Sequence, residues 1–108
     1  MIKPSKVVFI SEELERDFNI LKENDPIKKS IIRAIQDLRE NAFAGIQVPK
    51  RLIPQEYIQN YRANNLWKYD LPRGWRLLYT ITADNEIELI SAILEWFDHK
   101  NYERRFGY

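Results

Sequence analysis

The first part of the chain changes from a strand-like to a helix-like hydrophobic pattern. The β-branched run KVVFI at positions 6–10 predicts a strand. Ser11 has the residue type of a helix N-cap, and the two glutamates after it favour the positive end of a helix dipole. Apolar residues then recur on one face, so we predict a helix from Ser11 to about Lys22.

A second helix is predicted directly after the first. Asp25 suits a cap and Pro26 suits the first helical position, where no backbone N–H is needed. Apolar residues follow at helical spacing to about Phe43, and Gly45 is a plausible stop. The next stretch, 46–65, is irregular, with a short helix starting at Pro54 and loop elsewhere.

The second half of the chain has the alternating pattern of strands. LWKYDL at 66–71 and WRLLYTI at 75–81 alternate in hydrophobicity, and PRG between them is a turn in which Gly74 is free to take a positive φ. A second turn is predicted at TADNE, 82–86. IELISAILEWF at 87–97 is apolar on both faces, as a central strand is. In the 75–81 strand, alternation points Trp75, Leu77, Tyr79 and Ile81 inward and Arg76, Leu78 and Thr80 outward.

These elements predict one α+β domain over residues 1–108. Its expected architecture is a helical hairpin packed on a small twisted antiparallel sheet, in the order strand, two helices, then a three-stranded meander. The helices cover one face of this sheet. The other face is expected to be partly open and to carry Lys68 and Arg76, and the tail after residue 97 has the length to fold across it.

Composition narrows the class of protein further. The chain has no cysteine and one histidine, which excludes a disulfide scaffold and makes a protein-bound zinc site improbable, so we expect no metal and no cofactor. No signal peptide or membrane-spanning run is apparent, so a soluble, cytoplasmic domain is expected. The net charge is only +1, but residues 48–83 are basic and residues 84–95 are acidic. Such blocks are ordinary solvated surface as often as a functional patch.

The candidate chemistry is metal-free cleavage of RNA. RNA carries its own nucleophile, the 2′-hydroxyl, so a protein needs an acid–base group and cations that stabilise the phosphorane. His99, Tyr102, Arg76 and Lys68 have these residue types. A tyrosine with the usual pKa of about 10 is a poor base at neutral pH, so His99 is the better general base or acid.

The motifs NLWKYDLPRGWRLLYTI and ILEWFDHKNYERRFGY resemble the RelE/ParE toxin superfamily. The resemblance implies a RelE-like β-α-α-β-β-β fold. It also implies the toxin of a type II toxin–antitoxin system, a metal-independent endoribonuclease that cuts mRNA on the ribosome and is silenced by a cognate antitoxin. By the same resemblance Arg76 corresponds to the phosphate-contacting arginine, Lys68 to a charge-stabilising basic position, and His99 and Tyr102 to the functional positions of the tail. The near-neutral charge and the long 46–65 connection depart from the family pattern.

Each candidate also has an ordinary structural interpretation. Arg76 would face Asp70 if PRG is a three-residue hairpin loop, which predicts a cross-strand ion pair. Lys68 is a solvated strand residue unless the tail covers it, His99 is a strand terminator, and Tyr102 is a tail anchor. Further basic residues are candidate RNA-backbone contacts or isolated surface charges: Lys50, Arg51, Arg73, Arg104 and Arg105.

Two alternative functions stay open. One is a non-catalytic, ParE-like inhibitor of gyrase, and the other is a degenerate family member that only binds a partner protein, for example as a homodimer. The near-neutral charge favours these two functions, whereas Arg76 and the His99-x-x-Tyr102 spacing favour the nuclease.

Overall fold

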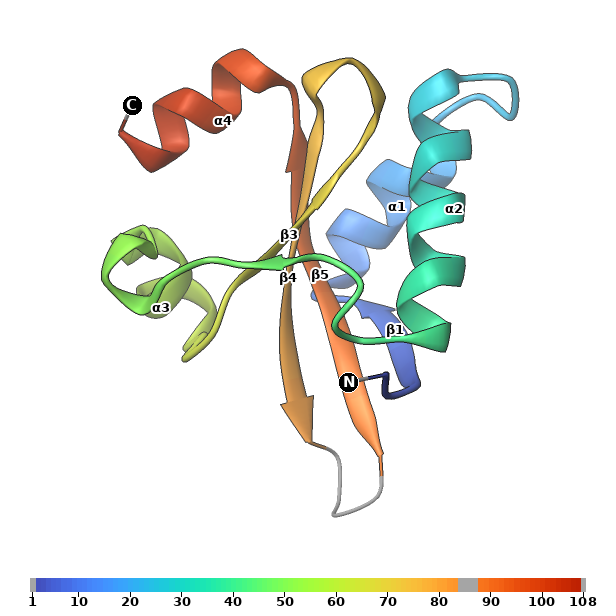
Figure 1. Ribbon diagram of the computed structural model, residues 1–108. Coiled ribbons are helices and arrows are strands. Elements are labelled where there is room, and N and C mark those ends of the chain that lie inside the picture. The colour runs from blue at the N-terminus through green and yellow to red at the C-terminus, as the bar shows by residue number, and fades with distance from the viewer. Residues whose placement is uncertain (1, 84–87, 108) are drawn as a thin grey trace.

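The computed structural model describes residues 2–83 and 88–107, and these form three layers (Figure 1). A five-stranded mixed sheet is sandwiched between helices α1 and α2 on one face and α3 and α4 on the other. The elements in chain order are β1 (Ser5–Phe9), α1 (Glu12–Ile20), α2 (Pro26–Glu40), β2 (Ile46–Gln47), the 3₁₀ turn η1 (Lys50–Leu52), α3 (Gln55–Tyr61), β3 (Trp67–Asp70), the 3₁₀ turn η2 (Pro72–Gly74), β4 (Arg76–Ala83), β5 (Leu89–Phe97) and α4 (His99–Phe106).

The first two helices begin where the sequence predicts. The Ser11 hydroxyl accepts a hydrogen bond from the Leu14 N–H at 3.1 Å, and the Asp25 carboxylate accepts one from the Ile27 N–H at 2.9 Å. These bonds satisfy backbone donors that have no partner inside the helix. Local capping chemistry therefore fixes where both helices start.

The end of α2 differs from the prediction, because the helix stops at Glu40 instead of about Phe43. Asn41 leaves the helix in an extended conformation, and its side-chain oxygen accepts hydrogen bonds from the N–H groups of Phe43 at 3.0 Å and Lys3 at 3.2 Å. An asparagine that bonds nearby backbone competes with helix continuation. The turn at Asn41 outweighs the apolar spacing that continues beyond it.

The sheet is mixed, which corrects the prediction of an antiparallel sheet. Its strand order is β1-β5-β4-β3-β2, and β1 runs parallel to β5 while the other neighbours are antiparallel. The parallel partner of β1 is the last strand, β5, so most of the chain joins the two strands. A tight hairpin between them would allow only an antiparallel pair. The three-stranded meander β3-β4-β5 is confirmed, and β5 is an interior strand between β1 and β4. The predicted 82–86 turn lies largely outside the described residues.

The second face of the sheet is covered, so the expectation of a partly open face is wrong for most of it. Leu78 and Thr80 were predicted to point outward, yet they are 0% and 5% exposed. α3, α4 and the segment around them form a second apolar core on that side: Val48, Ile53, Tyr57, Ala63, Leu66, Leu78, Leu94, Phe97 and Tyr102. The inward prediction for Leu77 and Tyr79 holds, because both are fully buried beneath α2.

Tyr79 joins the first core to the loop after α2. Its hydroxyl donates to the Ala42 carbonyl at 2.9 Å and accepts from the Gly45 N–H at 3.0 Å, and burial raises the pKa of Tyr79 to about 12. An unfolded tyrosine ionises at about pH 10. Between about pH 10 and pH 12 the unfolded state therefore loses this proton while the folded state keeps it, so stability falls as pH rises.

We expect Tyr79→Phe to lower the free energy of unfolding by about 1–2 kcal/mol at neutral pH, because the partly buried Gly45 N–H and the buried Ala42 carbonyl lose their partner. The deficit should shrink above pH 10, since the variant has no ionisation at this site. Urea unfolding at several pH values measures both effects. A deficit that stays constant through the alkaline range would contradict this account of Tyr79.

Candidate functional site

Strands β3 and β4 place two cations on the face of the sheet that α4 covers. Lys68 lies opposite Leu78, and Arg76 lies opposite Asp70, as the three-residue turn predicts. The Arg76 Nε is 2.9 Å from an Asp70 carboxylate oxygen, and one of its terminal nitrogens donates to the Trp75 carbonyl at 3.1 Å. The Arg76 side chain is 19% exposed, so its guanidinium is held in one place with one part open to solvent.

Both cations lie close to the ring of Tyr102 on α4. The Lys68 Nζ is 5.5 Å and the Arg76 Cζ is 5.3 Å from the centre of its ring, within the roughly 6 Å of a cation–π contact. The ring also packs against the rings of Phe97 and Phe106, with distances between ring centres of 5.9 Å and 4.6 Å. Tyr102 is 6% exposed. The tail thus folds back over the sheet and its phenol ring meets the guanidinium. Because the ring is covered, Tyr102 positions the cations and presents no open face to a nucleobase in this conformation.

His99 is the first residue of α4, three positions before Tyr102. Asp98 caps the helix by accepting from the Asn101 N–H at 2.9 Å. A Cβ built on Gly74 would come within 3.2 Å of the His99 Cβ, so the start of α4 packs against the β3–β4 turn. Gly74 has a φ of +80° there, which a glycine adopts without strain. The His99 side chain is 59% exposed and therefore accessible to a ligand.

The imidazole of His99 pairs with Glu103 one helical turn later, rather than with Arg76. The contact with Glu103 uses Nε2 of the imidazole and not Nδ1. A carboxylate that fixes the tautomer of a histidine is the arrangement that catalytic imidazoles use. The sequence interpretation missed Glu103. Its signal was the four-residue spacing from His99, which has meaning only once the tail is a helix.

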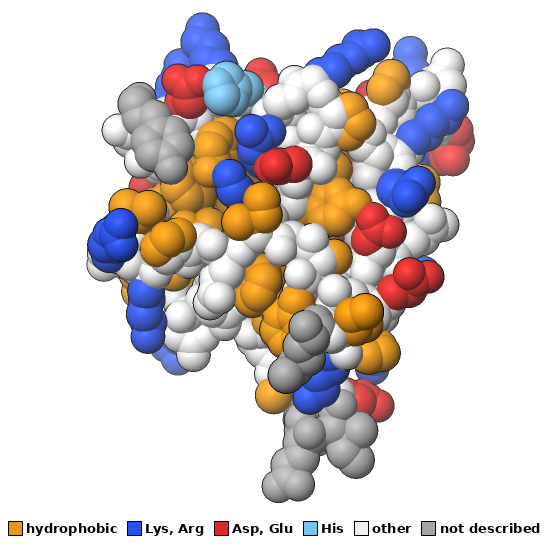
Figure 2. All heavy atoms as spheres, viewed as in Figure 1, with side chains coloured by type: hydrophobic (Ala, Val, Ile, Leu, Met, Phe, Trp, Pro, Cys, Tyr) orange, Lys and Arg blue, Asp and Glu red, His pale blue; other side chains and the backbone are white. Residues whose placement is uncertain are grey.

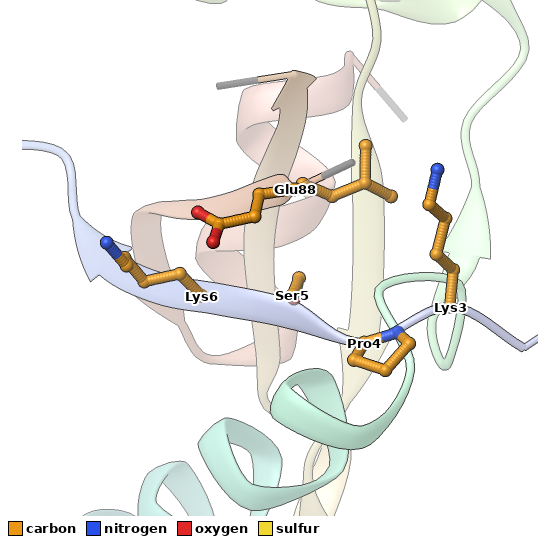
Figure 3. A pocket seen from close by; sticks show the side chains of 6 residues that line it. Lys3, Pro4, Ser5, Lys6 and Glu88 are labelled. Carbon is orange, nitrogen blue, oxygen red and sulfur yellow. The ribbon is translucent and has the colours of Figure 1, made fainter. Parts of the chain in front are cut away.

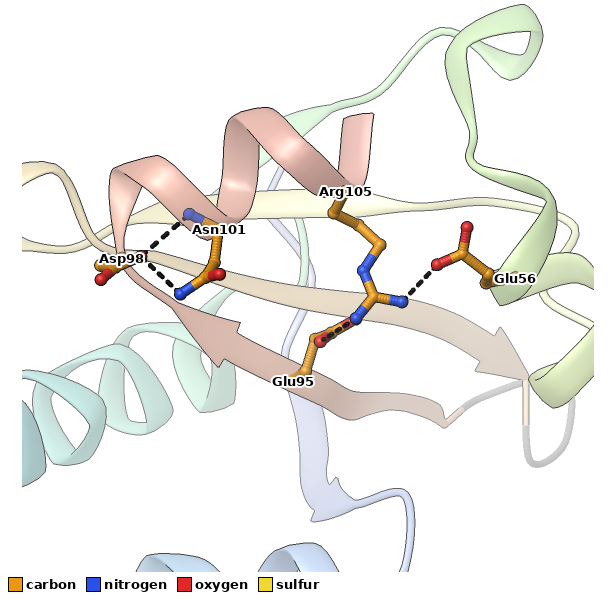
Figure 4. Close-up of polar contacts among 5 residues, drawn as sticks. All are labelled: Glu56, Glu95, Asp98, Asn101 and Arg105. Atoms are coloured by element: carbon orange, nitrogen blue, oxygen red, sulfur yellow. Dashed lines mark hydrogen bonds and ion pairs between the residues drawn. The ribbon is translucent and has the colours of Figure 1, made fainter. Parts of the chain in front are cut away.

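Arg105, a candidate RNA contact, is instead part of an internal ion-pair network (Figure 4). It pairs with Glu56 of α3 and lies 3.4 Å from Glu95 of β5. Partial burial alone would lower the pKa of Arg105, but the charges of Glu95 and Glu56 raise it above its ordinary value. The same network raises the pKa of buried Tyr57, through desolvation first and the neighbouring Glu95 second. Arg105 therefore connects α3, α4 and the sheet.

A bulge in β5 makes this network possible. Leu78 of β4 pairs with Glu95 and the next residue, Tyr79, pairs with Ile93, so Leu94 is an extra residue on β5. A bulge shifts the alternation of side chains by one position. As a result Leu94 and Phe97 both contribute to the core beneath α3 and α4, and Glu95 reaches Arg105.

Neutralising Arg105 should loosen α4. We expect Arg105→Gln to lower the free energy of unfolding by about 1 kcal/mol, because Glu95 loses its partner in a partly buried position. Arg104→Gln is the matched control, since Arg104 is the neighbouring exposed cation of the same helix. Thermal unfolding of both variants measures the difference. Equal melting temperatures would show that the ion pairs of Arg105 do not hold the helix.

The remaining predicted RNA contacts are exposed and dispersed. Lys50 and Arg51 lie in η1, Arg73 lies in the β3–β4 turn beside Gly74, and Arg104 lies on the last turn of α4. On the face shown in Figure 2, basic, acidic and histidine side chains lie next to apolar atoms at the end of the molecule where Figure 1 shows α4. Of the five predicted contacts, Arg73 and Arg104 lie within three residues of a member of the Lys68–Arg76–Tyr102 cluster, and Arg105 is engaged in ion pairs with Glu56 and Glu95.

A separate hollow of about 490 Å³ lies at the start of β1 (Figure 3). Its lining contains Lys3, Ser5, Lys6 and Glu88 and includes none of the predicted site residues. Within the described ranges, no group of His, Asp and Glu side chains is arranged to hold a metal ion. None of the helices described is long and apolar enough to cross a membrane.

The fold and the site define a small α+β protein with two cations gathered around a buried tyrosine, next to an exposed histidine–glutamate pair. Comparison of the chain with protein-family models, with curated proteins and with solved structures found no significant match.

Proposed function

We propose that the chain is a RelE-like toxin, an endoribonuclease that cuts translated mRNA without a metal and uses the RNA 2′-hydroxyl as nucleophile. One observation carries this proposal. Lys68 and Arg76 come from adjacent strands and meet at the ring of Tyr102, and the solvent-exposed pair His99–Glu103 lies at the start of the same helix. The motif resemblance described above supports the same function.

The two cations suit the stabilisation of a phosphorane. A cation–π contact orients Lys68 and Arg76 without cancelling their charge, unlike a contact with a carboxylate. Asp70, the carboxylate paired with Arg76, is 52% exposed, so a phosphate oxygen can replace it at the guanidinium. In this mechanism Arg76 binds the scissile phosphate and Lys68 stabilises its second charge. Tyr102 acts through them as a positioning residue.

His99 supplies the proton transfer. Its Nδ1 takes the proton of the 2′-hydroxyl as the 2′-oxygen bonds to phosphorus, and the imidazolium then gives a proton to the 5′-oxygen as the bond from that oxygen to phosphorus breaks. The products are a 2′,3′-cyclic phosphate and a free 5′-hydroxyl. Glu103 holds Nε2 and stabilises the imidazolium that forms. Protons balance over the cycle without a further reactant.

We further propose that a cognate antitoxin protein silences this activity and that the ribosome presents the message. These two partners are implied by the resemblance to the toxin superfamily, and the exposed histidine is consistent with a site that is completed by a docked substrate. A short neighbouring gene for an antitoxin, whose coexpression abolishes growth arrest, would support this part of the proposal.

Mapping of transcript ends after induction in cells tests the function. Wild-type protein should produce new ends within translated codons, Arg76→Ala should remove them, and Arg39→Ala, an exposed cation on α2, should leave them unchanged. DNA damage with intact messages would instead indicate a gyrase inhibitor of the ParE type. If the wild-type protein causes no cleavage and no growth arrest, the toxin proposal is wrong.

A non-catalytic protein-binding module is the second candidate. It is favoured by the burial of Tyr102 and by the ion pair of Arg76 with Asp70, since both side chains have contacts within the chain in the absence of a substrate. In that case the same Arg76→Ala variant should lose stability while transcript ends stay unchanged in wild type and variant alike.

A further inference from the structure

The segment between β2 and β3 contains an apolar hollow of about 390 Å³, outside the cluster at Tyr102. Its floor is formed by Ile53 and Ala63, which are 8% and 5% exposed, and by Ile58, which is 41% exposed. Lys50, Arg62 and Asn64 complete the lining. Pockets for small organic groups have volumes from roughly 300 Å³ upward and combine an apolar lining with a few polar groups.

The cations of this segment are not neutralised. Lys50, Arg51 and Arg62 are exposed, and no ion pair joins any of them to a carboxylate in the described part of the chain. Glu56, the acidic residue of α3, is engaged by Arg105. The rim of the hollow therefore carries positive charge next to an apolar floor, which suits a ligand that is both flat and anionic.

Arg62 occupies its position at a backbone cost. It ends α3 in the left-handed region with a φ of +52°, where a side chain is strained and glycine is favoured. α4 ends in the same conformation with Gly107. Among the described residues other than glycine, those with positive φ are Arg62 and Arg73. At the left-handed end of α3, the Arg62 side chain forms part of the lining of the hollow.

We propose that this hollow binds one unpaired nucleotide of single-stranded RNA. The base packs on Ile53, Ile58 and Ala63, and the flanking phosphates contact Lys50 and Arg62. The proposal rests on the proposed function, for which it supplies a second contact on the substrate strand. α3 and α4 cover the same face of the sheet, so one strand can reach both sites (Figure 1).

An acidic helix of a partner protein is the competing occupant, and the dimensions favour the nucleotide. α3 has only seven residues, and the hollow extends over a single patch of it and the segments next to it. An amphipathic helix needs a groove with anchors along about two turns, at positions such as i, i+3, i+4 and i+7. One base between two phosphates needs only a single apolar patch with cations at its rim.

Fluorescence anisotropy with a labelled single-stranded oligoribonucleotide tests the proposal, in a His99→Gln background that prevents cleavage. Arg62→Gln should weaken binding about tenfold at low salt and make the slope of log K against log salt shallower by about 0.7. Ile58→Ser should weaken binding without changing that slope, because it removes no charge. Arg62→Gly should weaken binding like Arg62→Gln and raise the melting temperature by a few degrees, because it relieves the backbone.

Arg16→Gln is the matched control, since it removes an exposed cation from α1 on the opposite layer. An equal loss in Arg16→Gln and Arg62→Gln, or no loss in Arg62→Gln and Ile58→Ser, would overturn the nucleotide site and favour the acidic protein segment. Suppose that the binding assay rules out the nucleotide site, while wild-type protein still cleaves RNA and Arg76→Ala does not. In that case only the second contact is disproved, and the proposed function stands. If the His99→Gln background binds no RNA and wild type cleaves none, both proposals fail.

Discussion

Replacing His99 with glutamine should reduce RNA cleavage by a factor of about 10² to 10⁴, the usual contribution of a positioned acid–base group. Glutamine keeps a polar side chain but cannot transfer a proton. The fold should be unaffected, because the His99 side chain is 59% exposed and its charged partner Glu103 is on the same helix. Cleavage of a translated message, followed by primer extension, measures the rate, and circular dichroism confirms that the variant is folded.

A set of neighbouring variants separates a chemical role from a structural one. Glu103→Gln should lower the rate less than His99→Gln does, because Glu103 acts through His99. Lys100→Gln, an exposed neighbour on α4, is the control and should behave as wild type. A His99→Gln variant with wild-type cleavage would remove the imidazole from the mechanism.

Local signals in the sequence were sufficient to predict β1, the starts of α1 and α2, and the meander. Ser11 and Asp25 cap their helices as predicted, because the chemistry that starts a helix lies within three residues. The ion pair between Arg76 and Asp70 was also predictable, because the length of the turn fixes which residues are opposite one another. These are contacts between positions that are close along the chain.

The second layer of helices could not be predicted from alternation. Strand β4 alternates in a way that assigns Leu78 to solvent, but α3 and α4 bury it. The short helix predicted at Pro54 is confirmed as α3, but its packing against the sheet was not predicted. A leucine at an outward position was the available hint. The bulge that aligns Glu95 with Arg105 has no signature in the sequence of β5. Burial on this face of the sheet depends on contacts between segments that are distant along the chain, and the hydrophobic periodicity of one strand does not predict such contacts.

In the candidate site, too, the sequence predicted some contacts and missed others. The motif placed Arg76 and Tyr102 together, and in the structure the Arg76 Cζ lies 5.3 Å from the centre of the Tyr102 ring. The motif also placed His99 with them, whereas the structure pairs it with Glu103. The difference follows from the helical form of the tail. Residues four apart lie on the same face of a helix, so the imidazole of His99 contacts Glu103 on its own helix. Reading the tail as a helix would have identified Glu103.

The strand that carries Lys68 depends on a close approach that only glycine permits. A Cβ on Gly45 would lie 2.5 Å from the Lys68 carbonyl oxygen and 2.7 Å from the Tyr79 hydroxyl. The carbonyl belongs to strand backbone, and the hydroxyl is fixed by its bonds to Ala42 and Gly45, so neither moves without breaking a buried contact. We expect Gly45→Ala to lower the free energy of unfolding by about 3 kcal/mol and the melting temperature by about 15 °C.

Gly107→Ala is the matched control for this substitution. Its Cβ would meet no atom within 4 Å, but its φ of +75° is unfavourable for alanine, so a loss of about 1 kcal/mol is expected. Calorimetry of the two variants therefore compares a steric clash with a purely conformational cost. Because the clash acts on the backbone of Lys68, Gly45→Ala should also weaken RNA cleavage at temperatures where the variant is still folded. Melting of Gly45→Ala at or above the temperature of Gly107→Ala would show that the loop after α2 can retreat from β3, and the geometry that places Lys68 beside Tyr102 would then not depend on it.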